Sequence, residues 1–118
     1  MNSINPTNPT NPEIKILSKL LTPVFRKNGV EKALLFGAMA RGTATRHSDI
    51  DLMIVMPTQK RFFDRYDLFN EIHDLIKRKS IDLLIYSPEE LKAISHRSFI
   101  KKILDEGVTV YELGKKPA

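Results

Sequence analysis

Two aspartates separated by one residue, Asp49 and Asp51, have the type and spacing in this 118-residue chain that best suit chemistry. They open an apolar run over residues 52–56, and side chains two apart on a strand leave the same face. Their carboxylates would lie roughly 7 Å apart along the backbone, near enough to converge on Mg²⁺ or Mn²⁺. Alone, such a pair is more often a solvated strand entry. At the edge of a buried strand, two like charges favour a cation between them.

A glycine directly after another apolar run supplies the second part of the pattern. Gly37 follows residues 33–36, and Ala38 begins a short turn or helix. A glycine lets the backbone approach a ligand closely, and unpaired amides at a helix start favour an anion such as triphosphate. A lone glycine at this place is usually only a turn. Together with the two acids further along, it predicts a site for a nucleoside triphosphate and divalent cations.

The elements that position these residues follow from the spacing of the apolar positions. Asn11 and Pro12 suit the start of a helix that closes at Asn28-Gly29, and Pro23 predicts a kink or a break after Leu21. Strands are predicted at residues 33–36, 49–56, 81–86 and 108–112, with helices at 61–78 and from a capping box at 87–90 to about residue 105. This order predicts one small α/β (α+β) domain, a mixed sheet of about four strands with helices packed on it.

The two ends of the chain differ in composition from this domain. Residues 1–12 repeat Asn, Pro and Thr with nothing to bury, so we expect a disordered tail. The domain is expected over residues 13–114, followed by a C-terminal tail at 115–118.

Composition excludes several classes of protein. The chain has no cysteine, which excludes disulfides and thiolate metal sites, and no run long enough to span a bilayer. A cytoplasmic location is therefore expected, with no membrane partner. The net charge of +5 favours an acidic partner, but the short basic groups, Arg65 and Lys102 among them, fit solvated helix ends. Nothing in the sequence supports sequence-specific nucleic-acid recognition.

The stretch from Phe36 to Val55, FGAMARGTATRHSDIDLMIV, closely resembles the nucleotidyltransferases of the DNA polymerase β superfamily, especially the minimal nucleotidyltransferases. Their signature is Gly-Ser followed after about ten residues by Asp-x-Asp. The resemblance covers most of the chain after the tail, and it implies the nucleotidyltransferase fold. The family's third carboxylate stands on a later strand, where this chain has Asp82 before an apolar run.

The resemblance also implies roles for these residues. Asp49, Asp51 and Asp82 would be catalytic and would bind two Mg²⁺ ions, with Mn²⁺ as the alternative, while ATP serves as substrate. A hydroxyl would attack the α-phosphate in line and release pyrophosphate. Amides near Gly37 and Ala38 would hold the triphosphate.

Two residues of the predicted nucleotide site have a second interpretation, and a third departs from the family pattern. Arg41 could meet phosphate or pair with a carboxylate, and Ser48 suits a local turn. Ala38 replaces the family's serine and removes a hydroxyl donor typically worth about 0.5–1.5 kcal/mol, which predicts weaker nucleotide handling.

Larger members of the family carry a further domain for the acceptor, so here we expect a partner chain or a dimer mate to hold it. In size the chain resembles the minimal nucleotidyltransferase antitoxins of HEPN-type ribonuclease toxins. The leading hypothesis is transfer of AMP from ATP to a tyrosine of such a toxin. The alternatives are a catalytically weakened antitoxin that acts by binding, and an enzyme that modifies a small molecule.

Overall fold

The computed structural model describes residues 12–45, 48–59, 65, 69–76 and 80–115. Of the predicted tails over residues 1–12 and 115–118, residues 1–11 and 116–118 lie outside these ranges, as does much of the predicted helix at 61–78, whereas Pro12 is the first residue of a helix. Within the described ranges, every helix is too short or too polar to cross a membrane.

Within the described residues, four strands form one mixed sheet, as the sequence predicts. They are β1 (Lys32–Phe36), β2 (Ile50–Val55), β3 (Ile81–Tyr86) and β4 (Val108–Glu112), in the order β3-β2-β1-β4. β1 pairs antiparallel with β2 and β4, whereas β2 and β3 are parallel. β4 forms one edge of the sheet and β3 forms the other.

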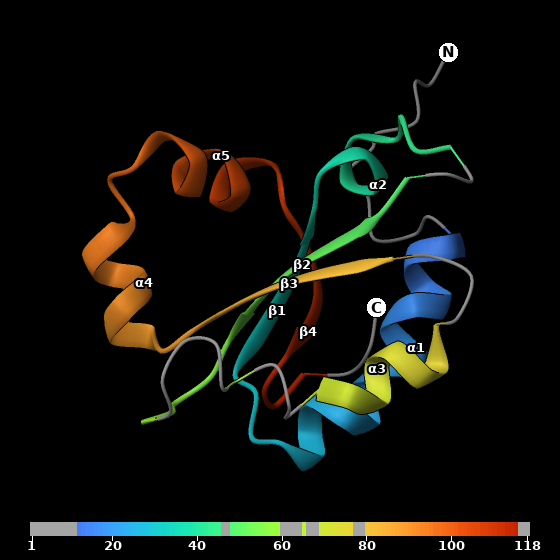
Figure 1. The fold of residues 1–118 in the computed structure, drawn as a ribbon, viewed down its shortest axis with the longest axis horizontal. Helices are drawn as coiled ribbons and strands as arrows, with labels where there is room; N and C mark the ends of the chain where they lie inside the picture. The colour runs from blue at the N-terminus through green and yellow to red at the C-terminus, as the bar shows by residue number, and fades with distance from the viewer. Residues whose placement is uncertain (1–11, 46–47, 60–64, 66–68, 77–79, 116–118) are drawn as a thin grey trace.

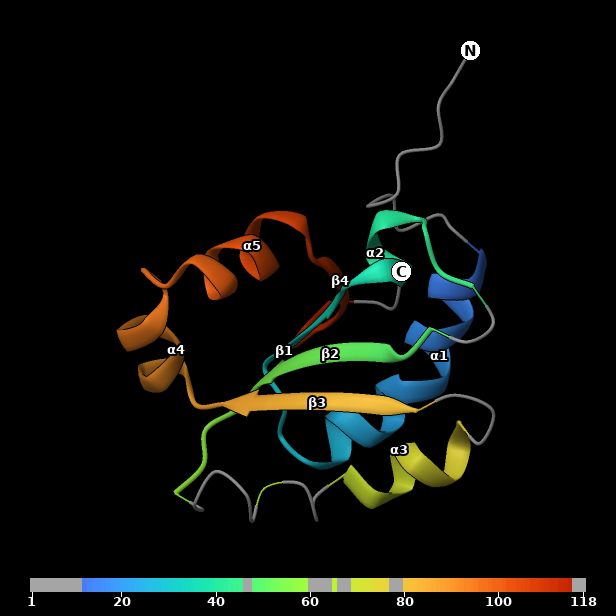
Figure 2. The ribbon, with the colours of Figure 1, turned by 45° about the horizontal axis from the view of Figure 1, so that its top comes forward.

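Five helices are present in the described residues, and they cover both faces of the sheet (Figure 1). α1 (Pro12–Lys27) and α3 (Asn70–Leu75) lie on one face, and α4 (Pro88–Ile94) and α5 (Ser98–Glu106) lie on the other. The short α2 (Ala38–Arg41) joins β1 to the loop before β2. Figure 2 shows the two parallel strands side by side, with α3 beneath them.

The first face carries the main core. The odd-numbered residues of β1 and β3 and the even-numbered residues of β2 pack against α1, as period-two alternation requires. Phe25 of α1 contacts both Phe69 and Tyr111, with ring centroids 6.2 Å and 5.5 Å apart. This cluster fixes α1 across the sheet.

The alternate residues of the strands face α4 and α5, where a smaller cluster forms around Leu34, Met53, Ile100 and Ile103. This cluster covers only part of the face. The remainder, at the end of β1 and the beginning of β2, is where polar side chains of the strands can reach solvent.

One helix prediction is wrong, and another is wrong in part. α1 continues through Pro23 without a break, because its buried residues on either side of the proline hold it against the sheet; a kink at the proline stays a prediction. The helix predicted from residue 88 to about 105 is two helices, α4 and α5, separated at Ser95, His96 and Arg97. The capping box is confirmed: the Ser87 hydroxyl accepts from the Glu90 amide, and the Glu90 carboxylate accepts from the Ser87 amide.

Arg65 is a buried ion-pair partner, so the expectation of a solvated side chain is wrong. Its side chain is 4% exposed, and it donates to Glu90 and to the Ile85 carbonyl at 3.1 Å. A buried guanidinium requires such partners. The Arg65 bonds and the Ser87 amide hold the pKa of Glu90 down at about 2.

We therefore expect Glu90→Gln to destabilise the protein by about 1–2 kcal/mol at pH 7. The pKa of Glu90 is lower in the folded chain than its ordinary value of 4.5. Its ionisation thus stabilises the fold above about pH 4.5, and this contribution is lost as the pH falls toward 2. Urea unfolding between pH 7 and pH 2.5 measures the difference. Glu89→Gln, an exposed change in the same helical turn, is the control, and equal effects of the two changes at pH 7 would contradict the assignment.

Candidate functional site

A row of three residues crosses the open part of the α5 face. Asp51 lies opposite Phe36 of β1 and opposite Asp82 of β3 in the strand register. All three project toward the smaller cluster, because each is offset by one residue from the main core positions. Neighbouring strands are about 4.8 Å apart. The register therefore places the carboxyl groups of Asp51 and Asp82 side by side on neighbouring strands.

Gly37 lies directly against this row. Its φ of +76° belongs to glycine, and a Cβ at this position would lie 2.3 Å from Asp51 Oδ2. Any side chain there would displace the carboxyl group. The glycine that the sequence singles out is thus required for two reasons, the turn from β1 into α2 and the space that Asp51 occupies.

The pKa of Asp51 is raised to about 6. The largest cause is burial, followed by the negative charges of Asp82 and Asp49 and a hydrogen bond with Asp82, while Arg41 opposes the shift. Near neutral pH the folded chain therefore concentrates acidic groups that repel one another. Sites of this kind favour a cation.

The other predicted residues occupy the surroundings of the row. Asp49 is exposed and lies just before β2, so it is near the strand rather than within it. Ala38 is the first residue of α2, and Arg41 is the last. The Ser48 hydroxyl accepts the Thr45 amide at 2.9 Å, which confirms the turn interpretation; its contact with nucleotide stays a prediction.

Two grooves meet at this row. The first, of about 340 Å³, lies between Asp51 and α5, and its cationic lining residues are Arg41 and Lys102. The second, of about 380 Å³, lies over β3 beside Asp82 and His73. Phe36, Asp51 and Phe99 line both grooves. A ligand in either groove would therefore reach the Asp51 carboxyl group.

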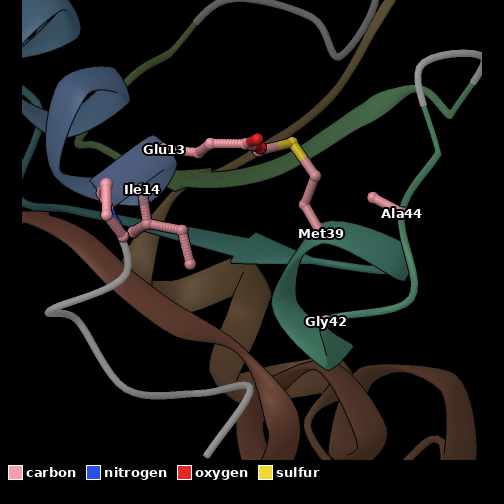
Figure 3. Close-up of a pocket in the computed structure, with 6 residues that line it drawn as sticks. Glu13, Ile14, Met39, Gly42 and Ala44 are labelled. Atoms are coloured by element: carbon pink, nitrogen blue, oxygen red, sulfur yellow. The ribbon is translucent and has the colours of Figure 1, made fainter. Parts of the chain in front are cut away.

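A further pocket, of about 420 Å³, lies at the beginning of α1 beside α2 (Figure 3). Its lining includes Glu13, Ile14 and Met39, and it contains none of the three predicted catalytic aspartates. On the four-residue α2, Met39 points away from Gly37 and Arg41, which are two positions away on either side. The chemistry-bearing residues thus gather on the other side of α2.

No three His, Cys, Asp or Glu side chains within the described ranges form a ready-made metal site. The carboxyl groups of Asp51 and Asp82 are instead near enough for the charge of Asp82 to raise the pKa of Asp51. Their oxygens, with those of Asp49, are the hard donors that Mg²⁺ prefers, and the mutual repulsion at Asp51 fits a cation. The metal role of the three aspartates stays a prediction.

A family model described as "Polymerase beta, Nucleotidyltransferase" matches residues 19–116 of the chain. This match includes β1, α2 and all three residues of the row, Phe36, Asp51 and Asp82. The chain belongs to this nucleotidyltransferase family. The family resemblance deduced from the glycine and the paired aspartates is confirmed.

Relatives of this nucleotidyltransferase include a "putative protein adenylyltransferase" of Methanocaldococcus jannaschii, 29% identical over 97 residues, which are 82% of this chain and 97% of that protein. A toxin–antitoxin crystal structure with AMP-PNP superposes with a TM-score of 0.60 at 19% identity, covering 82% of this chain and 74% of that one. A chain from the complex of tri-AMPylated Shewanella oneidensis HEPN toxin with MNT antitoxin gives 0.55 at 14% identity, covering 84% and 72%. At these identities the two structures establish the fold.

Sequence reasoning missed three residues of this nucleotidyltransferase that border the row: His73, Phe99 and Lys102. Lys102 was grouped with solvated lysines, and neither His73 nor Phe99 was among the predicted site residues. The one available signal is that Phe99 is an aromatic residue directly before the buried position Ile100. An amphipathic helix places such a residue at the border of its buried face.

The raised pKa of Asp51 predicts a pH-dependent effect of Asp51→Asn on metal-free protein. The carboxyl group ionises more readily in the unfolded chain, near 3.8, than in the folded one, near 6. Its contribution to stability is therefore present below about pH 4 and lost by about pH 6. In EDTA at pH 8, Asp51→Asn should stabilise the fold by on the order of 1 kcal/mol, allowing for solvent screening.

Chemical denaturation between pH 4 and pH 8 measures this effect. The gain from Asp51→Asn should disappear as the pH approaches 4, and Asp105→Asn, a change of an exposed aspartate on α5, should show no such dependence. A loss of stability in Asp51→Asn at pH 8 would refute the electrostatic interpretation.

Proposed function

We propose that this protein is a protein adenylyltransferase that transfers AMP from ATP to a tyrosine of a HEPN-type ribonuclease toxin, and so acts as its antitoxin. The observation that carries the proposal is the row at the end of β1 and the beginning of β2. It brings Asp51 and Asp82 together beside the glycine turn, in a family of nucleotidyltransferases.

The choice of AMP and of a protein acceptor has separate support. The Methanocaldococcus jannaschii relative is named for protein adenylyl transfer, and similarly folded structures include a toxin–antitoxin with AMP-PNP and an AMPylated HEPN toxin with its MNT antitoxin. The open part of the α5 face would let a protein acceptor approach the row.

Different residues of the chain would have different roles in the reaction. Backbone amides near Gly37 and Ala38 would hold the triphosphate, and Arg41 would offset its charge. Asp82 would accept the proton of the acceptor hydroxyl on a carboxylate oxygen. A bond would form between that hydroxyl oxygen and the α-phosphorus, and the bond from the α-phosphorus to pyrophosphate would break.

Asp49, Asp51 and Asp82 would hold two Mg²⁺ ions. When bound, the ions would supply neutralisation of phosphate charge in the transition state. The rest of the contribution of the chain is positioning, since in-line transfer depends on the alignment of the two reactants.

The test is transfer of label from [α-³²P]ATP to a candidate HEPN partner in the presence of Mg²⁺. The double change Asp49→Asn/Asp51→Asn should lower the labelling rate by at least about 100-fold, because metal ions supply several kcal/mol of transition-state stabilisation. Asp105→Asn serves as the control and should label normally.

Two results would contradict the proposal in different ways. Equal labelling by wild type and the double variant would exclude the aspartates from the reaction. If instead neither protein labels the partner, and the double variant still protects cells from the toxin, the protein is an antitoxin that acts by binding.

Ala38 provides a second, independent test. Restoring the family's hydroxyl by Ala38→Ser should strengthen ATP binding by about 2- to 10-fold, as expected for one added neutral hydrogen bond. Isothermal titration calorimetry with a non-hydrolysable ATP analogue measures the change. Ala93→Ser, at an exposed alanine of α4, is the matched control. An unchanged affinity in Ala38→Ser would show that position 38 does not contact the nucleotide.

A further inference from the structure

Phe99 is a large exposed aromatic residue at the junction of the two grooves. Its side chain is 58% exposed, although it lies on α5 directly beside the buried Ile100. Its ring meets Phe36 edge to face, with centroids 6.1 Å apart and planes at 84°. Even with this contact, more than half of the side chain stays exposed. Much of the ring surface therefore remains available to a ligand.

Charge distinguishes the two grooves that Phe99 borders. The groove beside α5 is lined by Arg41 and Lys102 as well as by Asp51 and Glu106. Among the described residues that line the groove over β3, there is no lysine or arginine, and Asp82 adds a negative charge. A polyphosphate chain is therefore favoured on the α5 side.

The spacing on α5 relates the aromatic ring to this charge. Phe99 and Lys102 are three residues apart, so they are neighbours on one side of the helix, and both line the groove beside α5. An aromatic platform next to a lysine offers the two contacts that a nucleotide needs, stacking for its base and a cation for its phosphates.

We propose that Phe99 is the stacking platform for the base of the nucleoside triphosphate, and that Lys102 contacts its phosphates. This subsite rests on the proposed function, since it assigns the α5 groove to the nucleotide and leaves the β3 groove to the acceptor. Stacking accepts any base, so Phe99 supplies affinity for a nucleoside without selecting adenine.

Binding of ATP and of inorganic tripolyphosphate, each with Mg²⁺, tests the assignment by calorimetry. Phe99→Ala should weaken ATP binding by about 5- to 150-fold and leave tripolyphosphate binding unchanged, because only ATP has a base. Lys102→Ala should weaken both. Phe99→Trp should restore ATP affinity, since it keeps an aromatic face.

The controls separate stacking from a general loss of structure. Ile16→Ala removes an exposed apolar side chain from α1, 66% exposed, and should change neither affinity. Unchanged ATP binding in Phe99→Ala would overturn the proposal, and so would an equal loss of ATP and tripolyphosphate binding, which would make the ring a packing residue.

The same measurements distinguish this subsite from the proposed function. Phe99-dependent ATP binding without AMP transfer to a HEPN partner would support the subsite and refute the transfer. AMP transfer with ATP affinity unaffected by Phe99→Ala would do the reverse. A wild-type protein that binds no ATP would refute both.

Discussion

The register between β2 and β3 is the constraint on which the candidate site depends. Because the strands are parallel and Asp51 pairs with Asp82, two carboxyl groups that are 31 positions apart in sequence become neighbours. A shift by one residue would turn Asp82 into the main core and Leu83 out of it. Burial of Ile81, Leu83 and Ile85 opposes that shift. The hydrophobic alternation of β3 thus keeps Asp82 beside Asp51.

The two faces of the sheet have different roles: one carries the main core, and the other carries the candidate site. α1 and α3 cover one face with most of the core, whereas α4 and α5 cover the other only in part. The break at Ser95, His96 and Arg97 separates α4 from α5. The Arg65–Glu90 pair holds the beginning of α4 against the chain near β3. α5 then packs through Ile100 and Ile103 and presents Phe99 and Lys102 beside the row.

Local patterns were sufficient to predict the strands, and they singled out the glycine and the paired aspartates whose role in the site stays a prediction. The alternating apolar residues, the glycine and the aspartates each lie within a short stretch of sequence, so they can be recognised without knowledge of distant segments. The features that could not be predicted depend on contacts between distant segments. Arg65 has the same local appearance as a solvated arginine, and only the position of Glu90 makes it a buried partner. Phe99 likewise lies beside the row because α5 packs against β1.

The contact of Gly37 with Asp51 has a consequence for how this sequence can vary. The missing Cβ and the carboxyl oxygen occupy neighbouring space, only 2.3 Å apart, so the two positions behave as one unit. A side chain at position 37 would force the Asp51 carboxylate away from its present position, and the positive φ of Gly37 would strain that side chain whatever residue stood at position 51. The placement of the Asp51 carboxylate thus depends on position 37 as well as on position 51, although the two residues lie on different elements of the fold.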